Sequence, residues 1–400
     1  METTTTSPSP TDSRTRWVGV GHSTAGDART AGAEAARAAL EGDDPKLLVV
    51  FCSNEFELPE LIAAIAGEAP ETPLIGCSTA GEIGPEGAAT KSVVVTAFGG
   101  DGFSARSAAA DRASTHLREA GSEVATALLA ADPDRPHRAV MLLTDALGGD
   151  QQEVIRGAYA VLGAGVPLVG ACAGDDFGFT ATFQFHEGRV CSDTLVGAVL
   201  ESNAPLGIGV RHGWRPVGEP VLVTRSEGNR VFTLDDRPAV DVYLDRFDAP
   251  PEAHTDTTAF AQFAMTHPLG LGRRSSEDGA RFVASANFED GSLEMIAAVP
   301  QGGVAWFLEG DVDSVLDATD EACRDAVEAL DQRAPLAFVA FDCAARRLVL
   351  GDDGIEREVE RIARHANGAP IAGFYSYGEI ARTRGASGFH NETLVVLAVS

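Results

Sequence analysis

The chain contains almost no lysine. Only Lys46 and Lys91 occur among 400 residues, the other 29 basic side chains are arginines, and the formal charge is −28. Nucleic acids and anionic membranes are bound through a basic face, so this charge argues against both as partners. Excess acid with little lysine is expected of a protein adapted to high salt, where net charge maintains solubility. A GC-rich codon bias towards arginine, alanine and glycine gives the same composition, and the sequence leaves both explanations open.

Long apolar runs are also missing. No run approaches the roughly 20 residues that a membrane-spanning helix requires, so no membrane insertion is expected. Residues 1–16 lack the apolar core of a signal peptide and are rich in Thr, Ser and Pro. They are predicted to form a disordered tail, and the protein is expected to be cytoplasmic. A chain of 400 residues exceeds one ordinary domain, so two domains are expected.

Familiar cofactor and metal motifs are missing too. The sequence has no P-loop, dinucleotide-binding fingerprint, zincin, EF-hand or c-type haem motif. Its six cysteines form no CxxC pair and no zinc spacing with histidine. These absences predict no resident metal or cofactor and weaken the case for an enzyme.

The chain does contain one phrase three times. The copies are PLIGCSTAGEI at 73–83, PLVGACAGDDF at 167–177 and PIAGFYSYGEI at 370–380. Each runs from Pro through Gly to a second Gly and an acid, which is Glu82, Asp175 or Glu379. An apolar run precedes each copy and another follows it. Repetition of this kind indicates a fold built from duplicated structural units.

The spacing of the apolar runs predicts the elements of one unit. In the first unit we expect strands at 47–52, 74–77 and 92–98 and a helix at about 56–67. A helix between the first two strands is the crossover that a parallel pair requires, while the third strand is free to be antiparallel. The predicted fold is therefore α/β, with mixed sheets built from repeated β-α-β-β units in two domains.

Further helices and the domain limits follow from periodicity and turn signals. Helices are predicted at 29–40, 115–130, 151–163, 239–247, 311–330 and 355–366, the last starting at a capping box of Asp353 and Glu356. Residues 205–238 carry many Gly, Pro and Asp-Asp turn signals between short β-rich runs, so we interpret them as a connecting segment. The predicted domains are then residues 17–204 and 239–400.

The Gly-acid phrases are the first candidates for a ligand site, because loops beyond the carboxyl ends of parallel strands bind ligands in α/β sheets. Glu82 or Glu379 could receive a ligand ammonium group. Ser78, Thr79 and nearby backbone amides could receive a carboxylate. Gly-acid pairs at strand ends also make simple turns, and for Asp175 this structural interpretation is favoured.

Other candidates lie near the C-terminus. His390 and Asn391 precede the last predicted strand, where they either face a pocket or make a turn. Tyr375 and Tyr377 lie beside an acid in a chain with only four tyrosines, and aromatic faces with a carboxylate suit a cationic or flat ligand. His212, among aromatics and arginines, could also face a pocket.

An enzyme remains the alternative class. The segment GCSTAG lacks the G-x-S-x-G spacing of a nucleophile elbow. Cys77 within it could act as a nucleophile, although a small buried thiol is the simpler interpretation. The carboxylates of Glu82 and Glu379 are the other groups on which a reaction could depend.

Four segments together resemble the FIST family, whose two parts are the FIST N and FIST C domains. They are PLIGCSTAGEI, HGWRPVG, VTRSEGNRVFTLDDRPAVDVY and GFYSYGEIARTRGASGFHNETLVVL. The last is the most specific, and the resemblance extends from about residue 17 to the end of the chain. The family motif falls on Glu82, Tyr377, Glu379, His390 and Asn391.

This resemblance implies an intracellular sensory module of prokaryotic signalling that binds small ligands such as amino acids. No kinase, methyl-accepting or cyclase segment is recognisable, so its output is expected to pass to a separate signalling protein such as a kinase. Some members are described as haem-binding sensors of nitric oxide, which here would use His390 or His212 as axial ligand. We therefore expect a non-catalytic sensor with its pocket between the Gly-Glu loops and the His390 loop. A haem sensor and an enzyme are the two alternatives.

Overall fold

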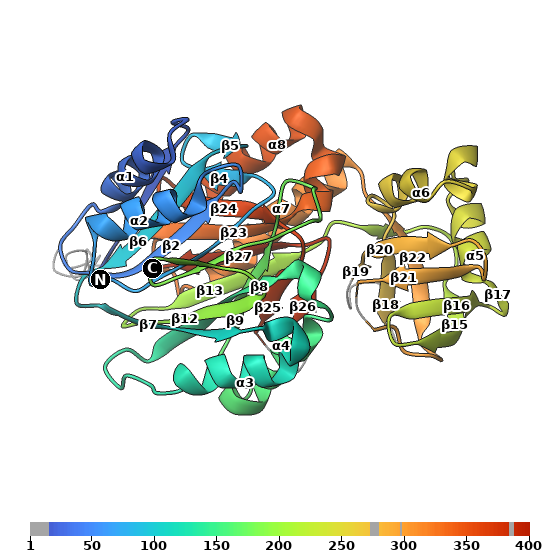
Figure 1. The fold of residues 1–400 in the computed structure, drawn as a ribbon, viewed down its shortest axis with the longest axis horizontal. Helices are drawn as coiled ribbons and strands as arrows, with labels where there is room; N and C mark the ends of the chain where they lie inside the picture. The colour runs from blue at the N-terminus through green and yellow to red at the C-terminus, as the bar shows by residue number, and fades with distance from the viewer. Residues whose placement is uncertain (1–15, 273–279, 297, 384–387) are drawn as a thin grey trace, which may run out of the picture.

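The computed structural model describes residues 16–272, 280–296, 298–383 and 388–400, so the predicted disordered tail falls outside it except for Arg16. Three units of similar construction form a large body, and a smaller lobe lies to one side of it (Figure 1). No helix in the described ranges combines the length and apolar character needed to cross a bilayer.

The three units repeat one order of elements: strand, helix, strand, helix, strand, hairpin, strand. The first unit comprises β1 (Trp17–Ser23), α1 (Ala28–Ala39), β2 (Pro45–Cys52), α2 (Leu58–Glu68), β3 (Leu74–Ser78), β4 (Glu82–Gly84), β5 (Gly87–Ala89) and β6 (Val93–Gly99). The second comprises β7 (Phe103–Asp111), α3 (Leu117–Ala127), β8 (His137–Asp145), α4 (Gln152–Leu162), β9 (Leu168–Ala173), β10 (Gln184–His186), β11 (Arg189–Cys191) and β12 (Thr194–Ser202). The third comprises β13 (Leu206–Arg211), α7 (Val312–Glu328), β23 (Ala337–Cys343), α8 (Ala344–Ala366), β24 (Ile371–Ser376), β25 (Glu379–Arg382), β26 (Phe389–His390) and β27 (Leu394–Val399).

Each unit contributes its hairpin to a neighbour's sheet. The three six-stranded sheets have the orders β1-β6-β2-β3-β10-β11, β7-β12-β8-β9-β25-β26 and β13-β27-β23-β24-β4-β5. Hairpin β4–β5 therefore completes the third sheet, β10–β11 the first and β25–β26 the second. The predicted pattern within a unit is confirmed, because β2 with β3, β8 with β9, and β23 with β24 are parallel while the last strand is antiparallel.

The first glycine of the repeated phrase is required by strand packing. A Cβ atom on Gly76, Gly170 or Gly373 would lie 2.3, 2.0 or 2.2 Å from a carbonyl oxygen of the neighbouring strand. Real Cβ atoms do not approach backbone oxygens so closely. This glycine thus serves the sheet in all three units.

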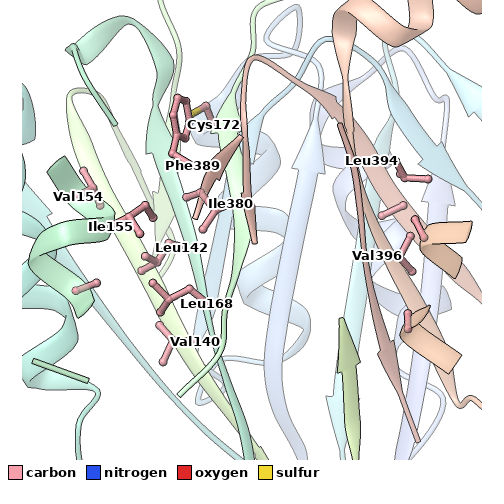
Figure 2. Packing of buried hydrophobic residues seen from close by; sticks show 14 of the residues in the cluster. Val140, Leu142, Val154, Ile155, Leu168, Cys172, Ile380, Phe389, Leu394 and Val396 are labelled. Atoms are coloured by element: carbon pink, nitrogen blue, oxygen red, sulfur yellow. The ribbon is translucent and has the colours of Figure 1, made fainter. Parts of the chain in front are cut away.

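The core lies on both faces of each of the three six-stranded sheets. Helix pairs α1–α2, α3–α4 and α7–α8 cover the outer faces, and the inner faces share a central core. Phe51 of the first unit packs there against Phe374 and Phe341 of the third, with ring centroids 4.5 and 6.0 Å apart. Figure 2 shows Ile380 and Phe389 of the exchanged third-unit hairpin beside the buried side chains of the second unit. Burial of such side chains binds the units into one body.

Residues 212–311 are inserted in the third unit between β13 and α7, and we call them the lobe. Its described residues form a nine-stranded sheet and two α-helices with a core of their own. Its elements are β14 (Arg215–Pro216), β15 (Val221–Glu227), β16 (Arg230–Leu234), β17 (Arg237–Pro238), α5 (Ala239–Arg246), α6 (Thr257–Ala264), β18 (Leu269–Gly272), β19 (Ala280–Arg281), β20 (Val283–Asn287), β21 (Ser292–Met295) and β22 (Val304–Glu309). The predicted connecting segment, residues 205–238, supplies β13 of the body and β14–β17 of the lobe.

The predicted helices lie within a few residues of the observed ones. Helix α8 consists of two helical segments that meet at a kink at Gly351, where φ is +59°, and the segment after the kink corresponds to the helix predicted at 355–366. The segment before the kink, which begins at Ala344, was not predicted, and the described residues contain no capping-box hydrogen bond between Asp353 and Glu356. A capping box does occur at the start of α7, between Asp311 and Ser314.

Candidate functional site

The two glutamates of the repeated phrase are buried and hydrogen-bonded within their own units. Glu82 begins β4, and its carboxylate accepts bonds from the Thr79 hydroxyl and from the Ser92 amide and hydroxyl, the last two at 3.1 and 2.6 Å. Glu379 begins β25 and accepts from the Ser376 hydroxyl at 2.6 Å. The Thr393 amide and hydroxyl donate to it at 3.1 and 2.8 Å. Each carboxylate thus fastens the start of a hairpin to the turn before the last strand.

Burial raises the pKa of both carboxyls to about 7, although hydrogen bonds from Ser92 and Thr79, or from Ser376 and Thr393, oppose this shift. Neither Glu82 nor Glu379 has exposed surface. Their hydrogen-bonding capacity is largely used inside the fold, so the geometry gives them a structural role.

The second copy of the phrase does not place its acid at the same position. Gln184 begins β10 and pairs with Cys77, as Glu379 begins β25 and pairs with Ala171. Its side chain accepts from the Thr194 amide at 3.2 Å, which repeats the bond from Thr393 to Glu379. The predicted equivalence of the three acids is therefore wrong in the second unit. The loop after β9 is longer there, so the hairpin begins at Gln184 and not at Asp175.

Asp175 organises this longer loop. Its carboxylate accepts bonds from the amides of Phe179, Thr180 and Ala181 at 2.7 to 3.1 Å, and from the Tyr377 hydroxyl at 2.6 Å. Burial opposes ionisation, but these hydrogen bonds together lower the pKa of Asp175. The Phe179 ring stacks on Tyr377 at 4.6 Å between centroids. Asp175 consequently makes a turn that holds an aromatic wall in place.

Four other predicted residues lie in the interior. Ser78 donates to the Gly174 carbonyl at 2.8 Å and accepts from the Phe183 amide at 3.0 Å, which ties the first unit to the loop that leads to β10. Cys77 and Tyr375 have no exposed surface, and burial raises the pKa of both. Thr79 bonds to Glu82 as described above. None of the four lines either of the two cavities described below.

An apolar pocket of about 230 Å³ lies where the body meets the lobe. The body lines it with residues at or just beyond the carboxyl ends of four parallel strands, and the lobe closes the opposite side. The lining residues are Ala146 and Leu147 after β8, Phe177 and Phe179 after β9, Cys343 to Ala345 and Leu348 at the end of β23, Ser376 and Tyr377 at the end of β24, Asn391 and Glu392 before β27, and Met265, Phe282, Ala284 and Ile296 from the lobe. Of the predicted site residues, this pocket unites Tyr377 and Asn391.

Two polar side chains of the lining lack partners. The Asn391 side-chain oxygen and both carboxylate oxygens of Glu392 are buried and accept no hydrogen bond within the described chain. Burial raises the pKa of Glu392 well above its ordinary value. Sequence reasoning missed this residue, although it follows His390 and Asn391 directly. A carboxylate beside two recognised polar residues, just before a buried strand, was the available signal.

The two histidines of the haem alternative line a different, larger cavity of about 710 Å³. His212 accepts from the Trp214 amide at 2.9 Å, His390 bonds to the Ala381 carbonyl at 2.9 Å, and burial lowers the pKa of both to about 4. The walls of this cavity include charged side chains of the body and of β14, the first strand of the lobe. They are Arg211, Arg215, Asp317 and Glu321. A porphyrin face requires apolar walls, and the apolar pocket contains no histidine. The described residues therefore do not fit a bound haem, and none of their histidine, cysteine and acidic side chains form a metal-binding group of three or more.

The chain resembles several proteins of unknown function. An uncharacterized protein of Methanocaldococcus jannaschii is 22% identical over 324 residues, which cover 76% of this chain and 61% of that protein. An uncharacterized protein of Mycobacterium tuberculosis is 26% identical over 391 residues, which cover 94% of this chain and 97% of that protein. A solved cyanuric acid hydrolase from A. caulinodans covers 96% of this chain at 11% identity, but its TM-score of 0.33 supports no conclusion.

Family models account for most of the sequence. The FIST N domain matches residues 46–237, and the FIST C domain matches residues 239–382. The two matches meet inside the lobe, just before α5, and together they include the second unit, most of the first and third units, and the pocket residues up to Tyr377. The chain thus belongs to the FIST family, as the four sequence segments predicted.

Proposed function

We propose that this protein is the ligand-binding component of a sensory pathway, and that its ligand is a small, largely apolar molecule held between body and lobe. FIST domains are associated with sensory signal transduction rather than with catalysis. The observation that carries the proposal is the pocket, because it is apolar, contains a few polar groups and lies beyond the ends of parallel strands. Its volume of about 230 Å³ is below the about 300–1,000 Å³ of pockets for drug-sized ligands, so the ligand is small.

The position of the pocket also suggests how ligand binding would change the structure. Both the body and the lobe line it, so a ligand that contacts both favours the arrangement in which they lie together. The change would be communicated to a separate signalling protein, for which a kinase is the expected type. Amino-acid-like molecules, the predicted ligands, belong in the first panel to be tested.

The geometry supports binding better than catalysis. Cys343 is the thiol that lines the pocket, and burial raises its pKa. No histidine lines the pocket in the described ranges, so this thiol has no neighbouring imidazole base. Cys77, the predicted nucleophile, is fully buried away from the pocket.

A thermal-shift screen with amino acids, amines and haemin tests the proposal. A ligand at about 100 times its Kd adds about 2.7 kcal/mol to the stability of the folded state. Ala284→Phe should abolish the shift, because Ala284 lines the pocket from an exposed position and a ring there would fill it. Leu348→Ala, in the pocket lining, and Leu129→Ala, outside it, form a matched pair because the two leucines are similarly exposed. Leu129→Ala is the control of this pair. A ligand shift that survives Ala284→Phe would place the ligand elsewhere.

A further inference from the structure

The three units share a turn between the hairpin and the last strand, and Glu392 occupies one position of this turn. The equivalent positions, two residues beyond the strand residue that pairs with Glu82, Gln184 or Glu379, are Lys91, Asp193 and Glu392. All three have left-handed backbone conformations, with φ of 54°, 50° and 63°. The backbone therefore presents these side chains in the same way, and differences between them arise from their surroundings.

Only in the third unit is this side chain buried without a partner. Lys91 is exposed and pairs with Glu55 at 2.9 Å. Asp193 accepts from the Ser114 amide and hydroxyl at 2.8 and 2.9 Å. Glu392 has an exposed fraction of 0%, and neither carboxylate oxygen has a hydrogen-bond partner among the described residues. The lobe, which the other units lack, lies on this side of the body and shares the pocket with Glu392.

Arg346, the cation that lowers the pKa of Glu392, is already engaged. Arg346 bonds to Asp342 and Glu358, each at 2.6 Å, and Arg347 bonds to the Ala80 carbonyl. No Lys, Arg or His lines the pocket in the described ranges. A buried carboxyl without a partner is costly, so the structure leaves a place for a positive group that comes from outside the chain.

We infer that the pocket takes an organic amine, in which an ammonium group is received by Glu392 and an apolar body of about one ring lies against Phe177, Phe179 and Tyr377. This inference rests on the proposed function and specifies its ligand. Aromatic faces around a cation add further attraction. A free amino acid fits less well, because its carboxylate would enter the pocket without a cation to meet it.

Binding of an amine should release a proton. Burial raises the pKa of Glu392 well above its ordinary value, so the pocket without a ligand favours the neutral form of this carboxyl. The amine arrives as an ammonium ion, the carboxyl transfers its proton to the solvent, and a carboxylate–ammonium pair forms. Amine binding is therefore accompanied by proton release, up to one proton for each amine bound. The other titratable and charged groups around this carboxyl are Glu379, Arg346, Cys343 and the lobe residue Tyr243.

Isothermal titration of the full chain with phenethylamine, phenethyl alcohol and phenylalanine tests the inference. These probes share a ring and differ in charge. Phenethylamine should bind about tenfold or more tightly than the other two, since a hydrogen bond to a charged group contributes about 1.5–3 kcal/mol. Titrations in two buffers with different ionisation enthalpies should show net proton release on phenethylamine binding, of at most one proton per amine.

Glu392→Gln is the decisive variant, because the amide has nearly the same shape and cannot ionise. It should fold, lose the preference for phenethylamine and release no proton, whereas the matched variant Asp193→Asn should bind like the wild type. Tighter binding of phenethyl alcohol or phenylalanine, or an unchanged amine preference in Glu392→Gln, would overturn the inference while the pocket itself stands. Absence of a thermal shift with every probe and every member of the wider panel would instead count against the proposed function.

Discussion

Glu379 and Gln184 occupy the same position in two different sheets. Each begins an exchanged hairpin, each pairs with the residue that follows the first glycine of a neighbouring unit's phrase, and each accepts a bond from the amide before or at the start of the last strand. Glu82 has this position in the third sheet. The chain therefore contains both the acid and its neutral counterpart in one architecture, which shows that the position requires an acceptor rather than a charge.

Glu379→Gln should accordingly fold, and it should change how stability depends on pH. The pKa of Glu379 is about 7 in the folded state and about 4.3 in an unfolded chain. The folded state therefore binds more protons than the unfolded state between these values, so stability falls as pH rises through this window. Glu379 contributes roughly 4 kcal/mol to this fall in stability, and the variant should lack that pH-dependent contribution. Urea unfolding at several pH values measures the slope.

The reverse exchange, Gln184→Glu, provides the control for this experiment. An acid at Gln184 would be buried between Thr182 and Thr194 in the same way, so this variant should show a steeper fall in stability with rising pH. Parallel pH profiles for wild type, Glu379→Gln and Gln184→Glu would contradict the raised pKa.

Gly170→Ala should be severely destabilising. The new Cβ atom would lie 2.0 Å from the Leu142 carbonyl oxygen, and φ at Gly170 is +138°, which is unfavourable for alanine. We expect a loss of about 3 kcal/mol or more in the free energy of unfolding. Gly165→Ala is the nearby control, because no atom lies within 4 Å of its added Cβ. Similar unfolding midpoints for the two variants would show that the strands can separate at little cost.

Exchange of the hairpins should make the three units unfold together. Phe389 is buried against the second unit although it belongs to the third (Figure 2). Phe389→Ala should cost about 3–5 kcal/mol and lower the stability of the whole body, while Phe389→Leu should cost much less. Calorimetry should show one transition for the body in each variant. Separate unfolding of the segments before and after the lobe would contradict the exchange of hairpins.

The sequence predicted the regular elements better than their arrangement. Long strands and helices could be predicted because each contains several apolar residues at the spacing typical of its type. The three copies of the phrase indicated the duplication. The pairing of the hairpins could not be predicted, because β4, β5, β10 and β11 have only three residues each and their sheet partners belong to other units. The pocket escaped for a related reason. Glu392 resembles Lys91 and Asp193 in its backbone, and only the distant lobe distinguishes its environment.

A buried arginine with two carboxyl partners connects the body to the start of the lobe. Arg346 of α8 has no exposed surface, and it pairs with Asp342 of β23 and with Glu358 farther along α8. It also donates to the His212 carbonyl at 2.9 Å, where the chain leaves β13 for the lobe. One guanidinium thus supports two carboxyls and the first residue of the insertion.

Removal of this guanidinium should leave two buried carboxyls without their cation. Arg346→Met is expected to cost about 3–5 kcal/mol at neutral pH, because breaking a buried pair leaves charge uncompensated. The loss should shrink as pH falls, since burial raises the pKa of Asp342 and this carboxyl becomes neutral when it is protonated. Adding Glu358→Gln should recover part of the stability, as it removes one of the two uncompensated acids. Urea unfolding of the single and double variants measures both effects. An Arg346→Met cost that does not change between acid and neutral pH would mean that Arg346 acts through packing and its bond to His212 rather than through charge.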